Sequence, residues 1–156
     1  MQLRTATVED IPVLVSHRRR MFEDMAARKG VPYDPSHLDA MDAAYGPYLH
    51  VQLNNATTRA WVIVDGDRKV ASGALLFADW MPRPDGQKPG LAYVHSVYTE
   101  PDYRRSGLAR RILKAMIAEC RTRGLPRLTL HASEMGRPLY ASLGFVDTNE
   151  MRLMLE

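Results

Sequence analysis

The feature that most constrains this chain is an alternating stretch of residues that leads into a glycine loop and then into a basic amphipathic helix. Residues 91–98 alternate with a period of two, which predicts a strand. One face of that strand is expected to carry Leu91, Tyr93, His95 and Val97. Residues 108–120 repeat apolar side chains at three- and four-residue spacing, which predicts a helix.

The loop between those two elements has the properties of an anion site. It leads into a helix N-terminus, where the first N–H groups have no intrahelical partner and the helix dipole places partial positive charge. Gly107 has no Cβ, so the backbone there can approach a phosphate closely. The loop has neither the Lys-Ser/Thr ending of a Walker motif nor three dinucleotide-binding glycines. A nucleotide hydrolase and a Rossmann domain therefore fit poorly.

The charge of the chain is unevenly distributed. Lys and Arg number 21 against 18 Asp and Glu, a net charge of +3. Residues 104–127 hold eight basic residues and one acidic residue, so this segment is +7 and the remainder is −4. A local cationic segment on a near-neutral body favours a discrete anionic ligand over nucleic acid. A solvated helix face is the alternative interpretation of the same residues.

Length and composition exclude several classes of protein. The 156 residues, 46% apolar and 25% charged, predict one globular domain over residues 1–156. No apolar run approaches the roughly 20 residues that a membrane span needs, and the N-terminus does not resemble a signal peptide. Cys120 is the one cysteine, and the five histidines lack metal-ligand spacing, so we expect no disulfide and no metal. These features predict a soluble, cytoplasmic protein without a membrane partner.

The remaining patterns give the order of elements. We expect a strand at 1–5, a helix from Thr7 to about Gly30, and a loop at 81–90. The Gly46-Pro47 pair predicts a break between two helical pieces, 36–45 and 47–53. The other expected elements are a hairpin of 61–64 with 70–77, a strand at 128–130, a helix at 135–143 and a closing strand at 151–155. This order predicts a mixed α/β fold around one sheet.

Two motifs resemble those of one superfamily. Arg104-x-x-Gly107-x-Ala109 is similar to the Arg/Gln-x-x-Gly-x-Gly/Ala pyrophosphate loop of the GNAT N-acetyltransferases. About thirty residues later, the segment from Leu139 to Phe145 is similar to their Leu-Tyr-x-x-x-Gly-Phe signature. The resemblance implies a mixed, mostly antiparallel central sheet flanked by helices, with the coenzyme loop between the fourth strand and the third major helix.

The resemblance also implies a binding site for acetyl-CoA. Backbone groups of β-strand residues would pair with the pantetheine arm, and N–H groups of the loop would hold the pyrophosphate. Ser133 stands where many relatives have an asparagine, which is a departure from the family pattern. The residues implied to bind the coenzyme are Val97, Tyr98, Thr99, Arg104, Arg105, Ser106, Gly107, Leu108, Ala109, Arg110 and Ser133.

The same resemblance assigns candidate roles in catalysis. Tyr140 matches the tyrosine taken as general acid to the departing thiolate. A free alkylamine with a pKa of about 10.4 is protonated at pH 7, so a base is needed, and His95 is the candidate. A structural histidine, with a water chain as base, is the alternative. Acceptor contacts are expected from Arg18, Tyr45, Tyr48, Trp80 and Tyr93.

These features predict direct transfer of an acetyl group from acetyl-CoA to a primary amine of a small molecule or a protein. No cysteine or serine is placed to form an acyl-enzyme. A non-catalytic acyl-CoA-binding regulatory module on the same fold is the alternative, and a nucleic-acid binder is disfavoured by the −4 body. The strand expected at 151–155 could pair across a homodimer.

Overall fold

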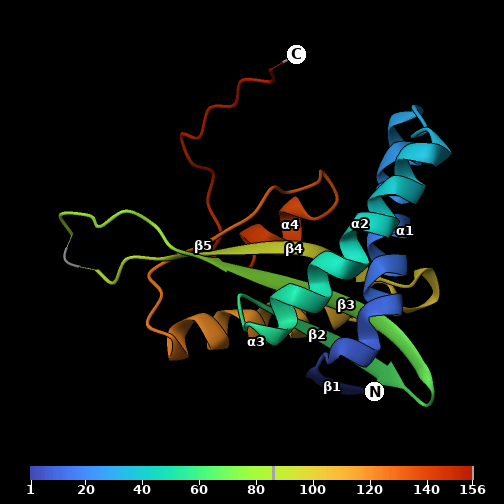
Figure 1. The fold of residues 1–156 in the computed structure, drawn as a ribbon, viewed down its shortest axis with the longest axis horizontal. Coiled ribbons are helices and arrows are strands. Elements are labelled where there is room, and N and C mark those ends of the chain that lie inside the picture. Colours follow the sequence, from blue (N-terminus) through green and yellow to red (C-terminus); the bar gives the residue numbers. More distant parts are fainter. Residues whose placement is uncertain (86, 156) are drawn as a thin grey trace.

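The structure, a computed structural model, describes residues 1–85 and 87–155 and contains one five-stranded sheet with helices on both faces (Figure 1). Short 3₁₀ turns at Val8–Asp10 and Pro101–Tyr103 precede α1 and α3. The strands are β1 (Gln2–Thr5), β2 (Thr58–Asp65), β3 (Arg68–Ala78), β4 (Leu91–Thr99) and β5 (Leu128–Thr129). The helices are α1 (Ile11–Lys29), α2 (Pro35–Asn54), α3 (Leu108–Thr122) and α4 (Arg137–Ala141).

The sheet has the order β1-β2-β3-β4-β5, and its first four strands are antiparallel. This confirms the mixed, mostly antiparallel α/β fold. Strand β5 runs parallel to β4 and pairs with it only through Ala92 with Leu128 and Tyr93 with Thr129. Beyond Tyr93 the two strands part, so within the described residues no strand pairs with that edge of 94–99.

Each face of the sheet is covered by different helices. Helices α1 and α2 lie side by side on one face (Figure 1). There Leu14 and Leu49 belong to one buried cluster with Val62 of the sheet. Helix α3 covers the other face with Ile112 and Met116, which are completely buried. The apolar stripe predicted for residues 108–120 is therefore the part of α3 that anchors it to the sheet.

Strand β4 contains a bulge that changes which residues share a face. Ser96 has a φ of +54°, and the register shifts so that Ala74 opposes His95 while Ser72 opposes Tyr98. One extra residue in one strand reverses the alternation that follows it. Val97 consequently packs on the α3 side, so the prediction that it shares a face with Tyr93 and His95 is wrong.

Helix α2 is continuous through Gly46-Pro47, so the predicted break into two pieces is wrong. A residue before proline is usually kept out of the helical conformation by its Cβ, and Gly46 has none. Pro47 lies on the exposed side of the helix, where water can reach the carbonyl of Ala43 that lacks its usual partner. Figure 1 shows α2 as one continuous helix that lies beside α1.

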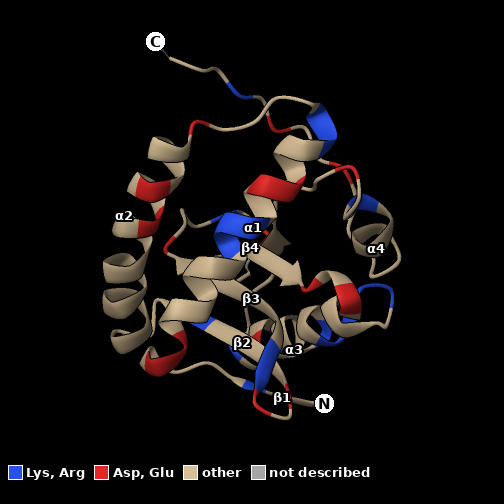
Figure 2. Cartoon of the chain, turned by 90° about the vertical axis from the view of Figure 1, so that its right-hand side faces the viewer, with Lys and Arg blue, Asp and Glu red and all other residues tan. Residues whose placement is uncertain are grey.

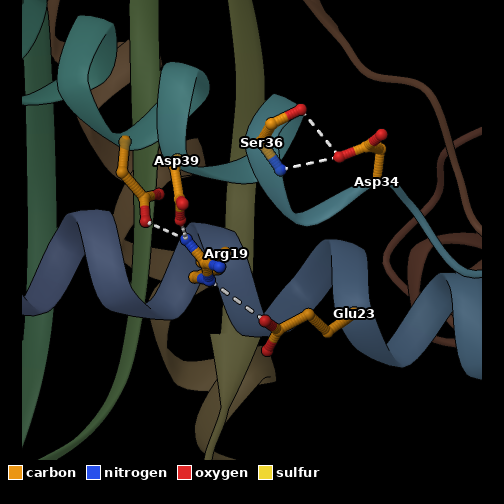
Figure 3. Close-up of polar contacts among 6 residues, drawn as sticks. Arg19, Glu23, Asp34, Ser36 and Asp39 are labelled. Carbon is orange, nitrogen blue, oxygen red and sulfur yellow. Dashed lines mark hydrogen bonds and ion pairs between the residues drawn. The ribbon is translucent and has the colours of Figure 1, made fainter.

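Charged side chains join α1 to α2. Arg19 of α1 donates to Asp39 at 2.7 Å and to Asp42 at 2.8 Å, both on α2, and to Glu23 on its own helix at 3.1 Å (Figure 3). The Asp34 side chain accepts from the Ser36 N–H at 2.8 Å and caps the N-terminus of α2. The ion pairs of Arg19 hold α1 and α2 against each other.

Three further predictions need correction. Residues 151–155 form no strand, so the structure gives no closing strand through which a dimer could pair. Helix α4 covers only 137–141 of the predicted 135–143, and the first helix begins as a 3₁₀ turn before Ile11.

Gly30 ends α1 at a φ of +68°, as its position predicted. In the part of the chain that the structure describes, no helix is long and apolar enough to cross a membrane.

Candidate active site

A cleft of about 1880 Å³ lies where β4 and β5 part. One wall comes from α1 and α2, the floor from residues 93–99, and the other wall from the loop at 103–110 and from residues 131–140. The sheet geometry thus brings together three segments that are far apart in the sequence. Most of the predicted site residues line this cleft.

The predicted coenzyme loop forms the anion-binding end of the cleft. Arg105 and Gly107 have φ angles of +61° and +82°, which turn the chain sharply into α3. The first turn of α3 lines the cleft through Leu108, Ala109 and Arg110, so its unpaired N–H groups lie at that end. No atom of the described residues lies within 4 Å of the position that a Cβ would take at Gly107, which leaves its backbone accessible.

Arg104 and Ser106 are bonded within the protein. Arg104 Nε donates to the Thr99 carbonyl at 3.0 Å, and its guanidinium pairs with Asp24 of α1. The Ser106 hydroxyl bonds to the Tyr103 carbonyl, and Ser106 does not line the cleft. The side chain of Arg104 therefore ties the loop to α1, whereas Arg105 is exposed beside the cleft.

His95 lies at the centre of the cleft floor. Its Nδ1 is 3.1 Å from Ser96 Oγ and 3.5 Å from Tyr45 Oη. Burial, with the Arg18 cation nearby, lowers the pKa of His95 to about 4. The imidazole is thus neutral at pH 7, and among the described residues its buried Nε2 has no hydrogen-bond partner.

Tyr140 stands on the wall opposite α1. It comes from α4, its ring meets Phe145 edge-on at 5.7 Å, and burial raises its pKa. A Cβ at Gly136 would lie 2.7 Å from the Tyr140 ring, so glycine lets the ring pack against the backbone. Within residues 1–85 and 87–155 no side chain or backbone group bonds to the Tyr140 hydroxyl. That hydroxyl is protonated at neutral pH and available to a ligand.

The predicted acceptor residues divide into two groups. Arg18, Tyr45, Tyr48 and Tyr93 all line the cleft. Trp80 does not: it follows β3, its side chain is exposed, and it lies outside the lining. The loop after β3 runs away from the sheet in Figure 1, and Trp80 at its start does not line the cleft.

Three residues of the site were not assigned a role from the sequence. Ser96 joins Arg18 to His95, because its Oγ accepts from Arg18 Nη1 at 2.8 Å. His131 Nδ1 lies 2.6 Å from Tyr93 Oη, and its Nε2 lies 3.2 Å from Glu150. Gly136 supports the Tyr140 ring and donates its N–H to Ser133 Oγ at 3.2 Å. The alternating pattern of residues 91–98 does not reveal a bulge at a serine, so the sequence could not predict the position of Ser96 in the site.

Comparisons with known proteins agree with this geometry. The family model described as "Acetyltransferase (GNAT) family" matches residues 15–145. A GCN5-related N-acetyltransferase from Ralstonia eutropha is similar at a TM-score of 0.88 and 28% identity, over 99% of this chain and 97% of that one. A structure described as a predicted acetyltransferase with acetyl-CoA, from Clostridium acetobutylicum, has a TM-score of 0.87 and 28% identity, over 99% of this chain and 95% of that one.

A curated relative extends the comparison over a shorter segment. Mycothiol acetyltransferase from Thermobifida fusca is 42% identical over 64 residues, which cover 39% of this chain. The match spans about a fifth of that relative's length, 19%. Since the family model covers most of the chain and the fold and cleft agree with it, this chain belongs to the GNAT acetyltransferase family.

Proposed function

We propose that this protein transfers an acetyl group from acetyl-CoA directly to the nitrogen of a primary amine. The observation that carries the proposal is one cleft in which the N-terminus of α3, His95 and Tyr140 meet. The family membership and the similarity to a structure solved with acetyl-CoA support acetyl transfer in general. The proposal goes beyond these comparisons by naming a primary amine as the acceptor.

The residues that are present fit the coenzyme. The anionic pyrophosphate would lie at the N-terminus of α3, with Arg105 and Arg110 as cations beside it. The edge of β4 at 94–99 has no strand partner in the described chain, so an extended pantetheine arm can add to it as a strand would. Bound acetyl-CoA supplies an acetyl group that is activated as a thioester.

His95 and Tyr140 provide the proton transfers. The oxygen of Ser96 has two lone pairs, so it can accept from both Arg18 and the Nδ1–H of His95. That arrangement leaves a lone pair on His95 Nε2. The acceptor ammonium first loses one proton to solvent, and Nε2 takes a second proton from the resulting neutral amine as its N–C bond forms. The C–S bond breaks, and the Tyr140 hydroxyl gives its proton to the leaving sulfur. Direct transfer needs no further residue.

The test replaces one hydroxyl and follows the release of CoA. With acetyl-CoA and a panel of amines, Tyr140→Phe is expected to lower kcat by about 100-fold. This is the lower end of the contribution that general acid catalysis typically makes to a rate. The Kd for acetyl-CoA should change less than about twofold, because Tyr140 acts on the leaving group. Tyr33→Phe removes a similar hydroxyl from an exposed tyrosine outside the cleft and should leave both values unchanged.

Two results would count against the proposal. Tight binding of acetyl-CoA without thiol release for any amine would favour a non-catalytic acyl-CoA-binding module. Full activity of Tyr140→Phe would remove Tyr140 as the acid and leave the sulfur to be protonated by water.

A further inference from the structure

Among the residues that the structure describes, Arg18 of the cleft has no acidic partner. Its Nη1 donates to Ser96 Oγ at 2.8 Å, and its guanidinium lies 4.7 Å from the centre of the Tyr45 ring and 5.1 Å from that of Phe22. Its Nε is buried and has no hydrogen-bond partner among the described residues. No carboxylate in that part of the chain lies within 4 Å of its nitrogens.

The neighbouring arginines on α1 show how unusual this is. Arg19 contacts three carboxylates, and Arg20 pairs with Glu100. Arg18 directly precedes them in the sequence but lines the cleft, where its guanidinium lies over aromatic rings. Desolvating a guanidinium without a counter-charge is costly. The Ser96 hydroxyl and the two rings offset part of that cost, and a bound anion would offset more of it.

The position of Arg18 separates it from the anionic end of the coenzyme. The loop is joined to α1 at Asp24, through Arg104. Asp24 lies six residues beyond Arg18, about 9 Å further along the helix axis. Arg18 instead shares the Ser96 hydroxyl with His95, so its free donors lie beside the group proposed to take the proton from the amine.

The surroundings of Arg18 describe the rest of the ligand. The cleft wall beside it is built mainly from apolar and aromatic side chains. These are Met21, Phe22, Met25, Met41, Tyr45 and Tyr48. Two acidic residues line the whole described cleft: Asp24, which pairs with Arg104, and Glu134, which is exposed on the far segment. The region around Arg18 is therefore cationic and apolar.

We propose that Arg18 binds a carboxylate of the acceptor, and that the acceptor is a small amino acid-like molecule with an apolar side chain. The inference rests on the proposed function and names its substrate class. An N–H fork on a guanidinium matches a carboxylate in bidentate geometry. With the carboxylate on Arg18, an amine one carbon away is held beside His95, and the side chain lies among the methionines and aromatic rings.

Matched pairs of acceptors test this directly. L-Leucine, L-methionine and L-phenylalanine are each compared with their carboxamides, with acetyl-CoA saturating and CoA release as the readout. We expect kcat/KM to be at least about tenfold higher for each acid than for its amide, the size of one charge-assisted contact. In Arg18→Gln that ratio should fall to near one, and Arg18→Lys should give an intermediate ratio because it lacks the fork.

Arg121→Gln is the matched control. It removes the same charge from an exposed residue on α3, outside the cleft, and should keep the ratio of the parent protein. A ratio near one in the parent protein, or an unchanged ratio in Arg18→Gln, would overturn the inference while leaving amine acetylation intact. If no amine is acetylated, the proposed function fails instead.

A binding measurement keeps the inference testable in that second case. Calorimetry with N-acetyl-L-leucine and N-acetyl-L-leucinamide, in the presence of CoA, measures the carboxylate preference without turnover. Preference for the acid that is lost in Arg18→Gln supports the carboxylate site. Equal affinity for the two compounds, or no binding of either, contradicts it. Thermal unfolding of Arg18→Gln confirms that the variant is folded in each experiment.

Discussion

At the scale of single residues, His95 shows how position changes chemistry. A histidine in water titrates near pH 6.5 and would be partly charged at neutral pH. In the cleft, burial and the Arg18 cation hold its pKa at about 4. The side chain is neutral through the physiological range, so it is always ready to accept a hydrogen bond or a proton, although it is a weaker base than a free histidine.

The depressed pKa of His95 predicts a loss of stability in mild acid. Unfolded, the imidazole takes a proton near pH 6.5; folded, it does so only near pH 4, so stability falls as the pH drops between these values. From pH 7 to pH 5 this linkage amounts to about 2 kcal/mol of unfolding free energy. Urea unfolding at the two pH values should show that His95→Gln lacks this part of the loss. His37→Gln, at an exposed position, should retain it.

At the scale of elements, the sequence predicted those parts of the fold that depend on periodicity. The alternation at 91–98 and the helical spacing at 108–120 correspond to β4 and α3, since both lie against a continuous core. Gly107 and the segment around Tyr140 also reach the cleft as expected. Their roles there, and a single domain over residues 1–156, stay predictions.

What the sequence did not reveal depends on local exceptions to periodicity. The bulge at Ser96 adds one residue without a glycine to mark it, so the face of Val97 was assigned wrongly. Trp80 was expected at the cleft but lies outside it. The long connection after β3 has no periodic pattern from which its path could be predicted. The contacts between Arg18, Ser96 and His95 join α1 to β4, and such tertiary pairs have no fixed spacing in a sequence.

Helix α2 offers a prediction about Gly46. In a helix interior, Gly→Ala usually stabilises by about 0.5–1 kcal/mol, and the nearest atoms to a Cβ here, on Ile11 and Val15, are 3.9 Å away. Before Pro47, however, a Cβ disfavours the helical conformation. Gly46→Ala is therefore expected to destabilise the protein by up to about 1 kcal/mol, and to stabilise it by about 0.5–1 kcal/mol in the Pro47→Ala background.

Chemical denaturation of the four proteins in this double-mutant cycle measures the coupling between Gly46 and Pro47. The same sign for Gly46→Ala in both backgrounds would show that Gly46 is not what allows α2 to continue through the proline.

At the scale of the whole molecule, charge and sheet geometry are arranged around the cleft. Figure 2 shows basic and acidic segments interspersed on the side that faces the viewer, rather than one continuous basic face. The +7 segment of the sequence also has internal partners, since Arg104 pairs with Asp24, and Arg123 pairs with Glu119 at 2.6 Å. The cations of the loop at 103–110 lie where the two halves of the sheet separate.

That separation predicts which backbone amides respond to the coenzyme. If the pantetheine arm adds to β4, hydrogen exchange of amides within 94–99 should slow when CoA is added, because the open edge becomes paired. Amides of β1, at the other edge of the sheet, should exchange at unchanged rates. Protection confined to the loop at 103–110, with none at 94–99, would contradict strand-like binding.

The extra residue at Ser96 changes which residues of β4 face each side of the sheet. Before it, odd-numbered side chains of β4 face the α1 side, as His95 does; after it, Tyr98 does so, with its ring 4.9 Å from that of His17. Val97 meanwhile lies against the α3 side, near Ile112 and Met116. Deleting that one residue would exchange the surroundings of valine and tyrosine, and would thus place a phenol in the apolar core and remove an aromatic ring from the buried histidine.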